Sequence, residues 1–146
     1  MSAGLGSLLD ERFELRHEVT LAPLSMRDAL DRALAASDGP VVVADVADNP
    51  GGGARGNTTF LLRAFHEADV GGALLGVFYD PDLAAEAHRR GVGSFFEARF
   101  NRSENTKFSE PYTASAKVVA LTDGNCVGPR GIYAGLRLEL GSCAAL

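Results

Sequence analysis

Residues 41–65, VVVADVADNPGGGARGNTTFLLRAF, constrain the fold more than any other stretch of the chain. Residues 41–44 are continuously apolar and rich in valine, a pattern typical of a strand buried on both faces of a parallel sheet. Pro50 and the glycines that follow it end this strand and allow backbone angles that a Cβ atom would forbid. A helix begins after Asn57 or Thr58, either of which can cap it. The stretch therefore predicts a strand, a glycine-rich loop and a helix.

A second continuous apolar run, residues 73–79, follows this helix and predicts a neighbouring buried strand. The unit 40–79 is long enough for a right-handed parallel crossover. Later segments alternate apolar and polar residues and predict strands over 94–100, 117–121 and 132–140, with a hairpin turn at 122–125. We therefore expect an α/β fold with a parallel strand–helix–strand core and a more antiparallel, β-rich second half.

Two further helices are marked by the residues at their ends. Ser25 followed by Asp28 forms an acidic variant of the capping box, and apolar residues follow it at helical spacing. Asp80 can cap another helix, whose first position is Pro81, where no amide donor is needed. Gly91 can close this second helix as a left-handed cap.

The glycine-rich loop is the first candidate site, because open α/β sheets bind ligands at the carboxyl ends of their strands. Neither the GxGxxG spacing nor a GK[ST] ending is present, so both nucleotide-binding fingerprints fail. Asp45 and Asp48 would repel a phosphate, but they suit a cation, an ammonium group or backbone donors. Alternatively, the loop is only a structural crossover whose aspartates bond their own amides. The candidate ligand-binding or domain-docking residues are Asp45, Asp48, Asn49, Gly51, Gly52, Gly53, Asn57 and Thr58.

The string ADVADNPGGGARGNTTFLLRAF resembles the ADTADNPGGGAPGDxTxxLRAL signature of the carboxyl-terminal domain of the MlrC family, the microcystinase C group of metallopeptidase-like proteins. The later matches are Asp80-Pro81, AHRRGVG at 87–93, Pro111, Lys117-Val118, Asp123-Gly124, Gly128-Pro129 and Leu140-Gly141. Val46, Arg55 and Asn57 depart from the signature, which has a hydroxyl residue, a proline and an aspartate at these positions. Family roles of those three positions therefore cannot be assumed in this chain.

The resemblance also implies a domain organisation. Residues 1–23 would be an amino-terminal segment or linker remnant, and residues 24–146 an MlrC-like carboxyl-terminal domain. The family pattern continues beyond Leu140-Gly141 with another strand and helix, so the resemblance implies a truncated domain. A sheet without its last elements exposes an edge and an apolar face, and we therefore expect self-association as one way to cover them.

The resemblance implies a zinc metallopeptidase or amidohydrolase that hydrolyses peptide or amide bonds, with linearised cyanobacterial peptides as the namesake substrates. In this family the zinc ligands lie in an amino-terminal domain, which this sequence lacks. The expected partner is therefore a zinc-bearing MlrC-like domain. The chain itself is expected to support hydrolysis without a cofactor and without catalytic or metal-binding residues.

The residues contain no complete hydrolytic motif of their own. His17, His66 and His88 are scattered, with no HxH or HExxH pair, and neither Cys126 nor Cys143 lies at ligand spacing. The nucleophile elbow GxSxG is also absent. Two alternatives to the split hydrolase therefore stay open: a non-catalytic small-molecule-binding module that uses the NPGGG loop, and an inactive truncated remnant.

Composition bears on the environment and on the class of partner. A net charge of −5, with no interleaved basic and aromatic residues, argues against nucleic acid as a partner. No apolar run is long enough to span a bilayer, so we expect no membrane association. The two cysteines form no CxxC pair and follow no signal peptide, which favours reduced thiols and a cytoplasmic location.

Overall fold

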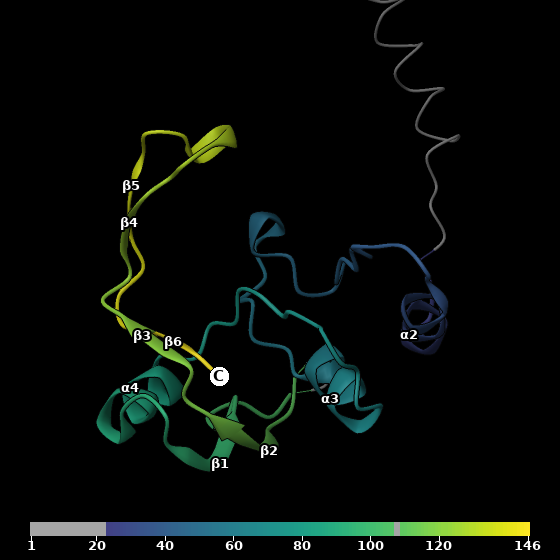
Figure 1. Ribbon diagram of the computed structural model, residues 1–146, viewed down its shortest axis with the longest axis horizontal. Coiled ribbons are helices and arrows are strands. Elements are labelled where there is room, and N and C mark those ends of the chain that lie inside the picture. Colours follow the sequence, from purple (N-terminus) through teal and green to yellow (C-terminus); the bar gives the residue numbers. More distant parts are fainter. Residues whose placement is uncertain (1–22, 107–108) are drawn as a thin grey trace, which may run out of the picture. The chain divides into compact units, whose positions relative to one another are not determined.

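The computed structural model describes residues 23–106 and 109–146, which form a mixed α/β fold of short helices and small antiparallel sheets (Figure 1). Two units are distinguished, divided between Gly39 and Pro40. The segment predicted over residues 1–23 lies outside the described residues apart from Pro23, and the predicted domain boundary after residue 23 stays a prediction.

The described part of the first unit contains one helix, α2 (Met26–Ala35). The Ser25 hydroxyl accepts a hydrogen bond from the backbone N–H of Asp28 at 3.1 Å and donates one to the Asp28 carboxylate at 2.7 Å. These two contacts confirm the predicted capping residues. None of the residues of α2 is buried, although its apolar residues recur at helical spacing.

The hydrophobic core of the second unit lies between helix α4 (Pro81–Arg90) and strand β1 (Phe95–Phe100). The Asp80 carboxylate caps α4 by accepting from the Leu83 N–H at 2.9 Å, as the sequence predicts. Strand β1 pairs antiparallel with β2 (Tyr112–Lys117). The buried apolar side chains that pack together are Leu83, Ala87, Phe96, Ala98 and Val118. Helix α4 therefore owes its position to the apolar face that it shares with β1.

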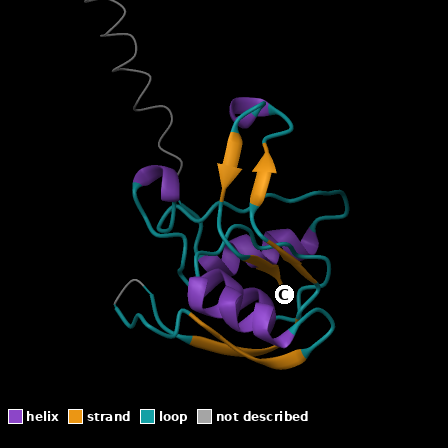
Figure 2. Cartoon of the chain, turned by 90° about the vertical axis from the view of Figure 1, so that its left-hand side faces the viewer, coloured by secondary structure: helices purple, strands orange, loops and turns teal. Residues whose placement is uncertain are grey.

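The chain then forms a nested antiparallel arm, which Figure 2 shows with a short helical turn at its tip. The strands of this arm are β3 (Ala120–Thr122), β4 (Asn125–Val127), β5 (Arg137–Glu139) and β6 (Cys143–Ala145). Strand β4 pairs with β5 around the 3₁₀ turn η2 (Gly131–Tyr133), and β3 pairs with β6 below them. The antiparallel, β-rich second half is thus confirmed. The turn at 122–125 joins two strands that do not pair with each other, so its assignment as a hairpin turn was wrong.

The parallel strand–helix–strand core is not confirmed. Its helix is present as α3 (Phe60–Glu67), but residues 41–44 and 73–79 form no strand. Their side chains are largely exposed: Val42 by 87% and Leu74 by 94%. A β-branched apolar run becomes a strand only where a neighbour pairs with its backbone. Among the described residues, the backbone hydrogen bond to these runs joins the Tyr79 N–H to the Gly56 carbonyl, which does not make a strand ladder. The apolar sequences of residues 41–44 and 73–79 predicted buried strands, but in the folded chain these residues stay largely exposed.

Phe95 and Phe96 provide a matched test of this core, because adjacent strand residues point to opposite faces. Phe96 is 6% exposed and Phe95 is 71% exposed. We expect Phe96→Ala to lower the free energy of unfolding by about 3–5 kcal/mol, because it leaves a cavity against α4. Phe95→Ala should change it by less than about 0.5 kcal/mol, as is usual for surface positions. Urea denaturation measures both, and equal losses would show that the core is misplaced.

Candidate functional site

The glycine-rich loop is held closed by its own aspartates. The Asp48 carboxylate accepts from the backbone N–H of Gly56 at 2.8 Å and from that of Thr58 at 2.7 Å. Asp45 accepts from the Ala47 N–H at 2.9 Å and from the Thr58 hydroxyl at 3.3 Å. Charge-assisted hydrogen bonds of this kind fix a loop more firmly than neutral ones. Both aspartates therefore have a definite structural task, and any ligand role would come in addition to it.

The three glycines of the loop form a single 3₁₀ turn and its end. The turn η1 (Pro50–Gly52) is capped by Asn49, whose side-chain oxygen accepts from the Gly51 N–H at 2.9 Å. Gly53 closes the turn with a φ of 94°, a left-handed angle that favours glycine. Asn49 and the glycines thus serve the geometry of the loop.

Gly56, which the sequence did not single out, is the residue on which the loop closes. It is buried, has a φ of 72°, and a Cβ atom there would lie 3.1 Å from the Pro50 ring. Its N–H binds Asp48, and its carbonyl accepts from the Tyr79 N–H at 2.7 Å. Its position within the family signature was the signal available in the sequence.

Asn57 anchors the loop to residues that follow β1, within 101–106 and at 109. Its amide donates to the Asn101 side-chain oxygen at 3.3 Å and to Glu104 at 3.0 Å, and its carbonyl accepts from the Ser109 hydroxyl at 3.2 Å. Asn101 and Ser109 also contact each other through their side chains. Asn57, Asn101 and Ser109 are each less than 9% exposed. Asn101 and Ser109 therefore contribute buried polar groups to this site.

Helix α3 begins at Phe60, directly after Thr59. Thr59, and neither Asn57 nor Thr58, is the N-cap of α3, and it makes no side-chain capping bond. Its hydroxyl instead donates to the Glu110 carbonyl at 2.6 Å, and the residue is fully buried. The predicted cap was wrong because tertiary hydrogen bonds use these side chains.

A polar pocket of about 200 Å³ opens beside this junction. The residues that line it are Arg55, Asn57, Tyr79, Asp80, Pro81, Asp82, Asn101, Ser103 and Glu104. Arg55 forms an ion pair with Glu104, and Asp80 accepts from the Asn101 N–H at 2.8 Å. Among the predicted site residues, Asn57 alone lines the pocket. The lining carries the carboxylates of Asp80, Asp82 and Glu104 and the guanidinium of Arg55, so it suits a small polar or cationic group better than an anion.

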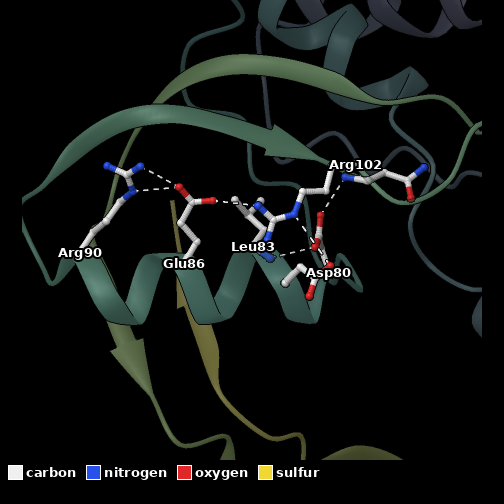
Figure 3. A network of polar contacts seen from close by, with 7 residues as sticks. Asp80, Leu83, Glu86, Arg90 and Arg102 are labelled. Atoms are coloured by element: carbon white, nitrogen blue, oxygen red, sulfur yellow. Dashed lines mark hydrogen bonds and ion pairs between the residues drawn. The ribbon is translucent and has the colours of Figure 1, made fainter.

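One side of the pocket is fixed to α4 by an ion-pair network, which Figure 3 shows from close by. Glu86 binds Arg90 at 2.7 Å and Arg102 at 3.1 Å. The hydrogen bond from Arg90, assisted by the positive charges of Arg90 and Arg102, holds the pKa of Glu86 below its usual value. The network therefore ties the turn after β1 to the helix as long as Glu86 is ionised.

The remaining chemistry-bearing side chains are dispersed. His66 contacts the Tyr112 hydroxyl at 2.8 Å, His88 contacts the Cys143 carbonyl at 3.0 Å, and His17 lies outside the described residues. Cys126 and Cys143 are free thiols. Over residues 23–106 and 109–146, no group of three or more histidine, cysteine or acidic side chains could hold a metal ion. No helix in these ranges has the length and apolar character to cross a membrane.

Sequence comparison assigns this fold and loop to a known class of domain. Residues 43–146 match the family model "MlrC C-terminus", and the chain belongs to this family, as the loop signature indicated. Among curated proteins it is similar to microcystinase C of Sphingomonas sp, with 30% identity over 94 residues. That match covers 64% of this chain but 18% of the relative, so the matched region makes up less than a fifth of the larger protein.

Asp48 and Asp45 give a matched test of loop closure. In Asp48→Asn one of the two backbone donors, on Gly56 or Thr58, loses its acceptor, and we expect a loss of about 1–3 kcal/mol in unfolding free energy. Asp45→Asn keeps an oxygen for the Ala47 N–H and should cost clearly less. Thermal and urea denaturation compare the two variants. Equal stability of Asp48→Asn and the parent chain would show that the carboxylate does not hold the loop.

The pKa shift of Glu86 predicts an acid-sensitive contribution to stability. Its pKa is lowered in the folded chain, so the stabilisation is complete above the unfolded pKa and is lost as pH falls through the folded pKa. We expect Glu86→Gln to lower stability at neutral pH and to flatten the fall in stability on acidification. Urea denaturation at several pH values measures this. Glu97→Gln, at an exposed position on β1, is the control and should change stability at neutral pH far less than Glu86→Gln.

Proposed function

We propose that this chain acts as the carboxyl-terminal domain of an MlrC-like zinc metallopeptidase or amidohydrolase. Family membership over residues 43–146 is the observation that carries the proposal. The relative named microcystinase C is a much larger protein, which supports the idea that the hydrolytic residues belong to another domain. The role of this chain would then be to support hydrolysis of peptide or amide bonds by binding that domain.

Zinc would be held by the partner domain. The described residues do not fit a zinc site, because they offer no cluster of three ligating side chains with a free coordination position. What this chain contributes is a rigid surface: a loop closed by Asp48 and a pocket fixed by buried amides. Such preformed surfaces lose little entropy when they bind a partner. No catalytic step is therefore assigned to residues of this chain.

The glycine-rich loop remains our proposed docking or ligand-binding element. Asp45, Asp48 and Asn49 lie on one continuous loop, and Asn57 links this loop to the pocket. We further propose that the parallel strand–helix–strand arrangement forms in the assembled protein, where a partner can pair with the apolar runs on either side of α3. The free thiols support our proposal that the protein is cytoplasmic.

A second candidate function is a small-molecule-binding module, favoured by the pocket beside Asn57. Asp80, Asp82 and Glu104 place carboxylates around it; Arg55 pairs with Glu104, and Arg102 lies 3.8 Å from Asp82. An ammonium or guanidinium compound would complement this rim. In this case binding would need no second domain.

Reconstitution separates the two functions. The part of the Sphingomonas protein outside the matched region is produced separately and mixed with this chain, Zn²⁺ and a linear peptide. We expect no hydrolysis by this chain alone, and more chelator-sensitive peptide release by the mixture than by the partner alone. The Phe96→Ala variant, with its core disrupted, is the control and should give no increase. Hydrolysis by this chain alone, or an unchanged rate in the mixture, would contradict the proposed function.

A further inference from the structure

Two exposed apolar segments, residues 41–44 and 73–78, are the least expected feature of the second unit. Val42 is 87% exposed, Leu74 94% and Val77 87%. Their sequences are rich in the valine, leucine and aromatic residues that favour strands. Large exposed apolar areas mark surfaces that bind other proteins, and each of these segments is a candidate for such a surface.

The backbones of these segments are also free to pair. Within residues 23–106 and 109–146, the N–H and C=O groups of both segments make no hydrogen bond to the rest of the chain. A strand-like run with unpaired backbone groups is a template for a further strand, since pairing satisfies the backbone and buries the apolar side chains together.

Both segments are followed by a residue that binds Gly56. Asp48, four residues after the first segment, accepts from the Gly56 N–H, and Tyr79, directly after the second, donates its N–H to the Gly56 carbonyl. The chain that follows each segment is therefore held by one buried glycine. Helix α3 lies between the segments in the sequence, which is the order of a parallel strand–helix–strand unit.

We propose that both segments become strands by pairing with an extended segment of the zinc-bearing amino-terminal domain, and that this strand addition is how the two domains bind. The inference rests on the proposed function, because it takes the occupant from it. More than four fifths of the Sphingomonas relative lies outside the match, which is ample chain to supply the pairing strand. A second copy is less suitable, because each copy carries a net charge of −5.

Hydrogen exchange measured by mass spectrometry tests the pairing directly. The probe is the part of the Sphingomonas protein outside the matched region, added to this complete chain. We expect the amides of both segments to exchange fast in the chain alone and to slow by at least about tenfold in the complex, as amides do when they join a stable sheet. The glycine-rich loop serves as the internal reference for general protection.

Val42 offers a matched pair of variants. Val42→Pro removes a backbone donor that the added strand needs, whereas Val42→Ala keeps the donor and trims the side chain. We expect the proline variant to lose the protection of residues 41–44 and to weaken the complex at least tenfold, and the alanine variant to retain protection. Because Val42 is exposed, both variants should fold, and circular dichroism checks this.

The outcomes separate this inference from the proposed function. A complex that forms without slowing exchange in either segment would leave the proposed function in place and overturn the strand pairing. Failure to form any complex would overturn both. Protection that grows with the concentration of this chain alone would show that a second copy covers the segments, and would also overturn the inference. Equal binding by the proline and alanine variants would contradict backbone pairing.

Discussion

The second unit depends on the hydrogen bonds that one buried residue, Asn101, makes through its backbone and its side chain. Its backbone N–H binds Asp80, the cap of α4, and its side chain contacts both Asn57 and Ser109. One residue at the end of β1 thus connects a helix, the glycine-rich loop and the segment before β2. Because a buried polar group without a partner is costly, these hydrogen bonds fix one arrangement of all three elements.

The sequence predicted those features that depend on local chemistry. The caps at Ser25 and Asp80 and the helix that begins at Pro81 follow from short-range signals, and each is present. The strand predicted over 94–100 is present as β1 (Phe95–Phe100). The family signature identified the domain, as the match over residues 43–146 shows. Asp48 and Asn57 were selected as candidates because they lie in a loop expected between the carboxyl end of a strand and the start of a helix.

Features that depend on distant partners could not be predicted in the same way. The buried roles of Asn57, Asn101 and Ser109 arise only when two loops more than 40 residues apart in the sequence meet. Residues 41–44 have the composition of a buried strand, but burial requires a neighbour that composition does not name. The turn at 122–125 was wrongly assigned to a hairpin because a turn sequence does not determine whether the strands on either side of it pair with each other.

The nesting of β4–β5 inside β3–β6 affects the order in which the arm folds. Thr122 pairs with Cys143 only after the intervening chain has been brought together, and the inner hairpin does this by pairing Asn125 with Glu139. Closing a short loop first and a shortened one next costs less chain entropy than closing the long loop at once. The arm should therefore fold from its tip toward β3 and β6, so that a slow step in this region would originate at the turn 131–133.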